Sequence, residues 1–339
     1  MQITNFSIKP RSINQTKLEQ FTKLGVSLDL LPKCEWHTTT FTIKNTYAGF
    51  ANGIRRALIE ELPTLCMDFD TAEIQTDDPF ILSDVVQKCI NLVPINQELK
   101  SRDINIKLHV INETDSVMDI KASHISCDKN VIPIPNITIA KLRPGKYLTI
   151  NKISIVEGLC KNSASKFSLL SNVKYEILDH VPFDVYEQKG VRSIEYDPKE
   201  FKLEFTTVGN IRPITVIKLL CDTLSARLER MSNLLKEYID FVSQKDGTDE
   251  YFSLGLEVKL IDEVKHYKFI NEYITLAYMV GQRCFLLDSN IKYCAPTINR
   301  YDSKEIGIIK LWHPDSNKLL MESIKECLAD VKKMEKEMI

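Results

Sequence analysis

Two acidic pairs early in the chain are the first candidates for chemistry. Asp68 and Asp70 are separated by one residue, and Asp77 is followed directly by Asp78. Paired carboxylates can clamp the metal ions of a polymerase or nuclease site. The sequence, however, contains no G-x-x-x-x-G-K-[ST] or G-x-G-x-x-G phosphate loop beside them. We therefore expect surface acids in turns, and we keep a stand-alone carboxylate-dependent or metal-binding enzyme as the alternative function.

Nine cysteines and six histidines are the other candidate ligands. The cysteines are odd in number, widely spaced and without a C-x-x-C pair, so a disulfide framework is not expected. His124 and Cys127 are the only close pair, and they lack the third and fourth ligands of a zinc site. The sequence predicts reduced, buried thiols, no metal and no cofactor. A cysteine–histidine nucleophile that forms only in space stays open.

A cluster of polar side chains lies in the segment 50–64, FANGIRRALIEELPT. Arg55 and Arg56 are adjacent, so on a helix they point about 100° apart and cannot both enter a core. Their planar guanidinium groups suit bidentate recognition at an interface, and a solvated helix face is the plainer alternative. Asn52 lies one turn before Arg56 and Glu60 one turn after it. Each either bonds locally or belongs to the contact.

Regular elements must position this cluster. Apolar residues recur at steps of three and four over 50–62, which predicts a helix that Pro63 ends. The segment 36–43 is rich in β-branched and aromatic residues and predicts a strand before that helix. Residues 65–160 read mainly as β-structure, and 201–208 alternate as another strand.

Two longer helices carry narrow apolar stripes, one starting near Pro213 and one near Pro314. A long stripe needs a partner to cover it. We expect the two stripes to pair within the chain, through Leu224, Leu228, Met231 and Leu235 on the first helix and Ile324, Cys327, Val331 and Met334 on the second. A linker at 244–250 separates the first helix from a compact unit. That unit reads as strand 252–260, helix 265–278, strands near 290–295 and 305–312, and the last helix.

The composition limits the class of protein. A chain of 339 residues suggests about two or three domains. The net charge of −2 argues against a protein that coats nucleic acid with positive charge. No apolar run approaches the ~18–20 residues of a membrane helix. We expect a soluble, intracellular protein without membrane contact.

The segment 50–64 resembles the α-motif of RNA polymerase assembly subunits. This is the family of the bacterial α subunit, the archaeal D subunit and the third-largest subunit of eukaryotic RNA polymerase II. The resemblance continues at Met67-Asp68, at 91–95 (NLVPI) and at 139–145 (IAKLRPG), and it spans about 36–240. In the loop after Gly158, Lys166-Phe167 match the family pattern, whereas Ala164 replaces its histidine.

Residues 250–339 resemble the small partner of that family, the archaeal L subunit or the eleventh subunit of polymerase II. The resemblance rests on the order strand, helix, two strands and long helix. The partner's H-T-[LI]-G-N signature is altered in 266–271, and only Tyr293 and Pro296 remain of its Y-x-x-P-H-P element. A fusion of the two partners resembles the polymerase subunit of large cytoplasmic DNA viruses.

The resemblance implies an α+β fold. An α/D-like dimerisation domain at 35–64 and 165–245 is interrupted by a mostly β insertion domain at 65–164. An L-like α/β dimerisation unit follows at 250–339, and 1–34 form an N-terminal arm. The implied function is a non-catalytic assembly scaffold of a multisubunit DNA-directed RNA polymerase, active in transcription. An α-like regulator outside polymerase is a third interpretation.

The resemblance also implies partners and a site. The partners are the largest and second-largest polymerase subunits and a small zinc-binding polymerase subunit; DNA is reached only through the complex, and no homodimer is needed. If the chain is viral, its expected location is the cytoplasm, in a viral factory or virion. If it is not viral, the expected location is the nucleus. Pro63-Thr64 could instead set the turn at the end of the helix, and Lys166-Phe167 could instead begin a strand. The candidate subunit-interface residues are Asn52, Arg55, Arg56, Glu60, Pro63, Thr64, Lys166 and Phe167.

Overall fold

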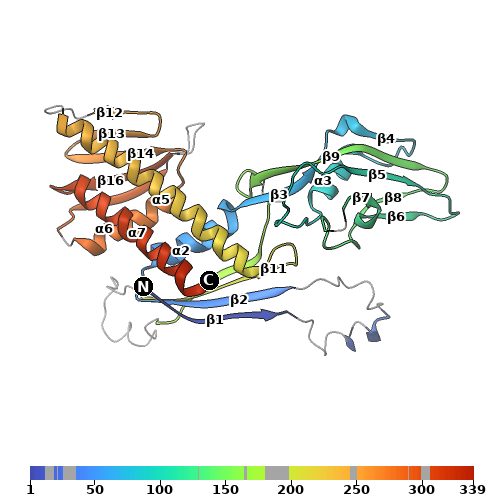
Figure 1. The fold of residues 1–339 in the computed structure, drawn as a ribbon, viewed down its shortest axis with the longest axis horizontal. Helices are drawn as coiled ribbons and strands as arrows, with labels where there is room; N and C mark the ends of the chain where they lie inside the picture. The colour runs from blue at the N-terminus through green and yellow to red at the C-terminus, as the bar shows by residue number, and fades with distance from the viewer. Residues whose placement is uncertain are drawn as a thin grey trace, which may run out of the picture.

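The computed structural model describes residues 1–11, 19–20, 22–25, 36–128, 130–163, 166–179, 198–244, 250–288, 290–298 and 306–339. Only the first and last residues of the linker expected at 244–250 lie within these ranges. Ala164 lies outside them. Figure 1 shows an elongated molecule, with a helical body that carries two sheets and a second, mainly β unit beside it. Among the described residues, no helix combines the length and apolar character needed to cross a membrane.

The first sheet of the body joins distant parts of the chain. It contains β1 (Gln2–Pro10), β2 (His37–Lys44), β11 (Glu200–Thr207) and β10 (Ser171–Ile177), in the order β1-β2-β11-β10 and antiparallel throughout. The strands predicted near 36–43 and 201–208 are confirmed. The first residues, expected as an arm, form the edge strand β1, which pairs with β2 over most of its length.

Two helices belong to the same part of the molecule as this sheet. The predicted helix at 50–62 is confirmed as α2 (Ala48–Arg56), which widens into a π-helical turn at Ala57–Glu61. It stops because Leu62 is extended and Pro63 begins a strand. The long helix α5 (Pro213–Gln244) starts at the proline, as predicted. We call β1, β2, α2, β10, β11 and α5 the amino-terminal half.

The insertion unit leaves the amino-terminal half at β3 (Pro63–Asp68) and returns at β9 (Tyr147–Leu159). Its sheet has the order β3-β9-β5-β7, with β4 beside β9 and a separate β6-β8 pair. A core of its own, including Met67, Leu108 and Ile150, holds the unit together. The prediction of mainly β-structure for 65–160 holds, but the helix α3 within this range was not predicted. The remaining elements are β4 (Ile74–Thr76), α3 (Ser83–Asn91), β5 (Ile106–Ile111), β6 (Met118–Lys121), β7 (Ile125–Ser126) and β8 (Thr138–Leu142).

The carboxy-terminal half contains the second sheet of the body, in the order β12-β13-β14-β16-β15. The helix predicted at 265–278 is wrong in its first part, which is the strand β14 with Tyr267 and Phe269 alternating into the core; the helix begins only at Ile274. The strand predicted at 252–260 is two strands. The elements are β12 (Glu250–Phe252), β13 (Leu256–Ile261), β14 (Val264–Ile270), α6 (Ile274–Leu287), β15 (Tyr293–Ile298), β16 (Ile306–Trp312) and α7 (Ser316–Met338).

The two halves repeat one plan. The order β1-β2-β11-β10 of the first sheet matches β13-β14-β16-β15 of the second, and every neighbouring pair is antiparallel. In each half a strand is followed by an asparagine with positive φ, Asn45 at 53° or Asn271 at 58°. Two residues later a tyrosine, Tyr47 or Tyr273, precedes the helix in extended conformation. The tyrosines therefore set a common reference for comparing α2 with α6.

The long helices α5 and α7 pack side by side across the junction of the halves (Figure 1). They run antiparallel, since Glu229 pairs with Lys332 at 2.8 Å, whereas Ser232 meets Met321 at 3.4 Å. All eight residues expected to pair these helices are buried in one core, which also receives residues from both sheets. The two halves thus share a single hydrophobic core.

Candidate subunit interface

The outer side of α2 carries four of the predicted interface residues. Asn52, Arg55 and Arg56 of α2 and Glu60 of the π-helical turn that continues it are partly exposed, as is Ile59, whereas the other apolar positions between them are buried. Arg55 Nε donates to Asn52 Oδ1 at 3.0 Å, and Arg56 Nη2 donates to Glu60 Oε2 at 3.3 Å. Exposed pairs one turn apart contribute only about 0.3–0.5 kcal/mol each. These local bonds orient the guanidinium groups, and they leave part of each available to a partner. We call these four residues the charged face of α2.

The side of α2 that carries Gly49 and Gly53 lies close to α6. The Gly49 N–H donates to Gln282 Oε1 at 2.6 Å, and a Cβ at Gly49 would lie 3.2 Å from the carbonyl oxygen of Tyr278. A Cβ at Gly53 would lie 3.0 Å from Met279 Cε. The two glycines, one helical turn apart, therefore permit the close approach. The sequence contained this signal, but its role could not be assigned without knowing the partner helix.

Tyr47 anchors the start of α2 in the carboxy-terminal half. Its hydroxyl donates to the Met279 carbonyl at 3.0 Å and lies 3.2 Å from Cys327 Sγ. The Arg283 guanidinium is 5.6 Å from the centre of the ring. Burial raises the pKa of Tyr47 well above its ordinary value, so the phenol remains a donor. The contact fixes α2 at its first turn.

A buried arginine holds the other end of α2. Arg227 of α5 bonds Glu61, at the end of the π-helical turn, and Glu272, just before α6. Its Cζ also lies 4.7 Å from the centre of the Tyr273 ring. We call Glu61, Arg227 and Glu272 the Arg227 cluster. Because it joins three elements from both halves, it fixes the orientation of α2 relative to the whole body.

Burial and charge oppose each other in the Arg227 cluster. Burial disfavours the charged guanidinium, but Glu272 and Glu61 raise the pKa of Arg227 above its ordinary value. For Glu272 burial dominates and raises the pKa, although Arg227 works in the other direction. Thr275 Oγ1 donates to Glu61 and satisfies its second carboxylate oxygen. Sequence reasoning missed the cluster, since its members are separated by more than forty residues.

The remaining predicted interface residues lie where the insertion unit joins α2. Thr64 is buried, and its hydroxyl donates to the Leu62 carbonyl at 3.1 Å, while Pro63 pairs with Leu159 in the β3–β9 ladder. Phe167 is also buried, and its ring occupies the space that a side chain at Gly158 would need. These side chains shape the junction, so they support the position of α2.

Lys166 faces an acidic residue of the insertion unit. Its Nζ lies 2.5 Å from Asp68 Oδ2, and Gln87 Nε2 donates to the other oxygen of Asp68 at 3.3 Å. Asp70 accepts from the Ala72 N–H at 3.0 Å and caps a short 3₁₀ turn. The two acids first considered for catalysis thus have separate structural partners. Within the described ranges, no three His, Cys, Asp or Glu side chains group together as a metal site.

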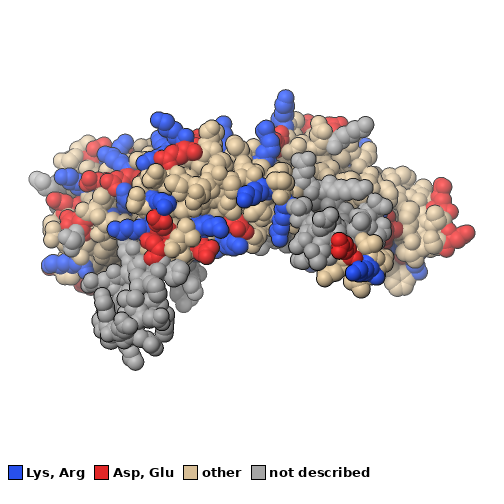
Figure 2. Space-filling model, turned by 90° about the horizontal axis from the view of Figure 1, so that it is seen from below, with Lys and Arg blue, Asp and Glu red and all other residues tan. Residues whose placement is uncertain are grey.

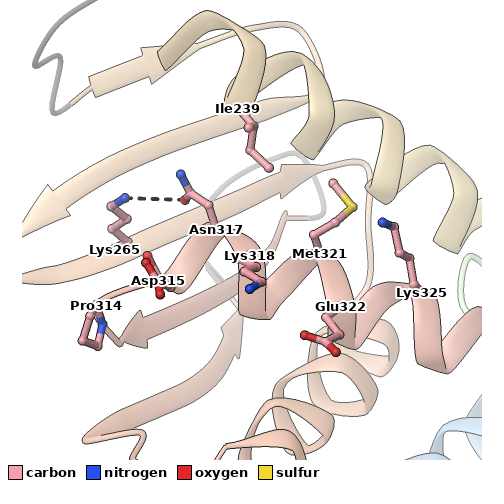
Figure 3. A pocket seen from close by; sticks show the side chains of 10 residues that line it. Ile239, Lys265, Pro314, Asp315, Asn317, Lys318, Met321, Glu322 and Lys325 are labelled. Atoms are coloured by element: carbon pink, nitrogen blue, oxygen red, sulfur yellow. Dashed lines mark hydrogen bonds between the residues drawn. The ribbon is translucent and has the colours of Figure 1, made fainter. Parts of the chain in front are cut away.

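A groove of about 680 Å³ lies at the start of α7, beside α5 and β14 (Figure 3). Its lining mixes lysines, an aspartate and a glutamate with Ile239 and Met321. Lys265 Nζ is 3.5 Å from Asn317 Oδ1, which also accepts from the Tyr267 hydroxyl at 2.5 Å. The side-chain oxygen of Asn317 at the wall of the groove is therefore already hydrogen-bonded. None of the predicted interface residues lines this groove.

The surface charge is mixed where the body can be inspected. Figure 2 shows basic and acidic side chains interspersed on this face of the body, while acidic side chains gather at the tip of the insertion unit. The whole chain has a net charge of −2. A protein that binds the phosphate backbone of a nucleic acid needs a continuous basic surface. This face suits contacts with other proteins better.

Comparison with known proteins points to one family. Residues 40–228, more than half of the chain, match the RNA polymerase Rpb3/Rpb11 dimerisation domain. A DNA-directed RNA polymerase subunit Rpo3 of Pyrococcus furiosus is 24% identical over 209 residues, which are 57% of this chain and 77% of the archaeal protein. The subunit Rpo3 of Pyrococcus horikoshii is 25% identical over 138 residues, covering 37% and 51%. The family match runs from β2 into α5 and therefore includes α2.

Proposed function

The chain belongs to the RNA polymerase Rpb3/Rpb11 dimerisation domain family, and from that premise we propose that it is a non-catalytic scaffold that docks the two largest subunits of a DNA-directed RNA polymerase. The homology to the two archaeal subunits supports an assembly subunit of a polymerase. Catalysis then belongs to the large subunits, and a small zinc-binding subunit completes the assembly.

One observation carries the proposal: the charged face of α2 is exposed while the rest of the helix is held rigidly. Tyr47 fixes the first turn, Gly49 and Gly53 permit close packing on α6, and Glu61 joins the Arg227 cluster. A rigid helix that presents oriented guanidinium groups loses little conformational entropy on binding. Arginine forks suit carboxylates and carbonyl oxygens of a partner.

The matching helix of the other half presents a different surface, which supports a second partner. At the positions of α6 that correspond to Asn52 and Glu60, the chain has Tyr278 and Leu286, and Phe285 precedes Leu286. These three side chains are about half exposed. An aromatic and aliphatic face next to a charged face gives the two large subunits distinct docking sites on one rigid body.

The repeated plan supports the carboxy-terminal half as a fused small partner. Both halves have the same strand order and contribute to one core. Covalent linkage makes their association intramolecular, with an effective concentration on the order of millimolar. A separate small partner or a homodimer is then unnecessary for covering α5.

The test is the double variant Arg55→Glu plus Arg56→Glu, co-expressed with the second-largest subunit. We expect loss of the complex in a pull-down and in size-exclusion chromatography. The isolated variant should lose no more than about 1 kcal/mol of its free energy of unfolding, because the two exposed pairs contribute little. Lys318→Glu plus Lys325→Glu on α7 is the matched control, which reverses two exposed charges away from α2 and keeps the complex intact. Unchanged affinity of the α2 variant for the second-largest subunit refutes the docking role.

A further inference from the structure

Two cysteines of the carboxy-terminal half lie together where α6 packs against β15. Cys284 on α6 is fully buried, and Cys294 on β15 is 8% exposed. The Cys294 thiol donates to the Gly281 carbonyl of α6 at 3.4 Å. Gly281 precedes Cys284 by three residues, so both lie on one face of the helix. The two thiols meet on this face and hydrogen-bond to each other. We call Cys284 and Cys294 the thiol pair.

A buried serine of α7 completes the surroundings of the thiol pair. Ser323 Oγ lies 3.1 Å from Cys284 Sγ and 2.9 Å from the Leu319 carbonyl oxygen, so its single proton can point to either. A negative charge on Cys284 draws this proton to the sulfur. A Cys284 thiolate thus has two donors, the Cys294 thiol and the Ser323 hydroxyl.

These donors give the two thiols different roles. The bond from Cys294, helped by Ser323, holds the pKa of Cys284 below its ordinary value, although burial acts in the opposite direction. The same bond between the thiols, together with burial, raises the pKa of Cys294 well above its ordinary value. Because the thiolate is the nucleophilic form of cysteine, Cys284 is the reactive member of the thiol pair.

Other buried cysteines have the opposite electrostatics. Burial raises the pKa of Cys66 and of Cys221 to about 12, so both thiols stay protonated at neutral pH. We call Cys66 and Cys221 the reference cysteines. They are as buried as the thiol pair, and they therefore report whether an oxidant acts on the folded chain selectively or on any thiol that unfolding exposes.

The position of the thiol pair also gives a small oxidant a route. A zinc site needs three or four protein ligands, and among the described residues no third His, Cys, Asp or Glu joins the two thiols. Adjacent thiols react with each other instead. The strand β15 is the outer strand of its sheet and has a ladder on one side only. Local opening of such an edge costs less free energy than opening of the core and exposes Cys294 first.

We propose that Cys284 and Cys294 form a reversible disulfide with hydrogen peroxide as oxidant, and that this disulfide tethers the last turn of α6 to β15. The Cys284 thiolate attacks one peroxide oxygen and becomes a sulfenic acid; the O–O bond breaks, and hydroxide leaves and takes up the Cys284 proton as water. The Cys294 sulfur then attacks the Cys284 sulfur. The S–S bond forms, the S–O bond breaks, and the hydroxyl leaves as a second water with the Cys294 proton. The thiols lose two electrons, which the peroxide gains.

The tether acts on an exposed part of α6. Phe285 and Leu286 follow Cys284 and are about half exposed, and the helix ends at Leu287. Joining this turn to β15 should slow its local opening, which hydrogen exchange measures. Disulfide formation needs the isolated chain alone, so it stands or falls separately from the docking role of α2.

Peroxide titration of the full chain at neutral pH tests the proposal. Cys284 and Cys294 fall on separate tryptic peptides, 284–292 and 293–300. After oxidation the remaining thiols are alkylated, and the chain is digested without reductant and analysed by mass spectrometry. The linked pair of peptides should be the main disulfide, while the reference cysteines are still alkylated. Dithiothreitol should remove the link. Hydrogen exchange in 284–292 should be slower in the oxidised chain and recover on reduction.

Variants separate the roles of the side chains. Ser323→Ala removes the hydroxyl beside Cys284, and Ser232→Ala, the matched control, removes a buried hydroxyl 3.4 Å from the Met321 sulfur. Ser323→Ala should slow disulfide formation at least about twofold, because the thiolate loses a donor, and Ser232→Ala should not. Cys294→Ala should abolish the link and leave a sulfenic acid on Cys284 that dimedone traps. Thermal melts check that each variant is folded.

Several results overturn the proposal. A linked peptide pair that stays absent at peroxide concentrations at which the chain is folded refutes the disulfide. Linkage of Cys284 to Cys327 gives it a different partner. Oxidation of the reference cysteines at the same peroxide concentration attributes the reaction to unfolding. Equal rates in the two serine variants remove Cys284 as the attacking thiol, and unchanged hydrogen exchange in 284–292 removes the tether.

Discussion

The two halves of the body have the same strand order, and each has one shorter and one long helix. The exposed side chains of the shorter helices, α2 and α6, differ in chemistry. Along α2 and the π-helical turn after it, the partly exposed positions include Asn52 and Glu60, beside the apolar Ile59. At the matching positions of α6 the chain has Tyr278 and Leu286. Both helices must bury their inner side in the same core, so that side is constrained in each half. The outer side is free to differ between the halves.

The halves also differ in the segment that comes after the outer helix. The carboxy-terminal half returns from α6 to β15 over a short connection, whereas the amino-terminal half inserts a whole folded unit. The insertion costs the fold little, because its ends meet: Pro63 pairs with Leu159 in neighbouring strands. A unit that leaves and returns at one point can form its own core without disturbing the core of the body.

The largest expected effect concerns Arg227, whose ion pairs link the two halves. Arg227→Met should lower the free energy of unfolding by about 3–5 kcal/mol, because two buried carboxylates lose their counter-ion. Arg283→Met is the comparison, since Arg283 pairs with Glu326 and Asp330, which are more exposed than Glu61 and Glu272. Urea unfolding followed by circular dichroism measures both. Equal losses for the two variants would mean that the Arg227 cluster is not the stronger link.

Pairing of the long helices predicts the next effect. Leu228→Ala should cost about 2–5 kcal/mol, because the side chain is fully buried in the shared core. Val331→Ala removes a buried side chain of the other half. If these residues pack closely, the double variant should show a coupling energy of about 0.5–3 kcal/mol in urea unfolding. Additive losses would argue against direct contact of Leu228 with Val331 and leave the pairing to other positions.

The close approach of α2 to α6 predicts a smaller loss. Gly53→Val should destabilise the chain by about 1–3 kcal/mol, because its side chain must displace Met279. Met279→Ala makes room, so the double variant should be more stable than the sum of the two single losses predicts. Differential scanning calorimetry measures all three variants. A double variant that is no better than additive would mean that the clash lies with atoms other than the Met279 side chain.

The sequence predicts the elements that local patterns determine. The stripes of α5 and α7 and the helix at 50–62 follow from spacing alone, because each helix must bury one side. The strand β14 was missed because the helix was predicted to begin at 265, although Tyr267 and Phe269 alternate into the core. The Arg227 cluster could not be predicted, since nothing local relates Glu61 to Glu272. The charged face of α2 was visible early, because adjacent arginines cannot both be buried.

The smallest expected effect tests whether the insertion unit behaves separately from the body. The folded pKa of Asp78 lies below its unfolded value, so its stabilising contribution is present above about pH 4 and is lost as the pH falls through the folded pKa. The folded pKa of Glu272 is raised, so its contribution is present below its unfolded value and is lost as the pH rises through the folded pKa.

Acidification from pH 7 to about pH 3.5 should therefore lower the protection of amides around Phe80 and Arg143, which bond Asp78, relative to their intrinsic exchange rates at each pH, before it lowers the protection around Glu272. Hydrogen exchange read by mass spectrometry resolves the two regions, and Asp78→Asn should remove part of the pH dependence in the insertion unit alone. The variant is informative because it keeps the shape of the side chain and removes its titration. If both regions open together over the same pH range, the insertion unit and the two-half body form one cooperative unit, and the separation between them is structural but not energetic.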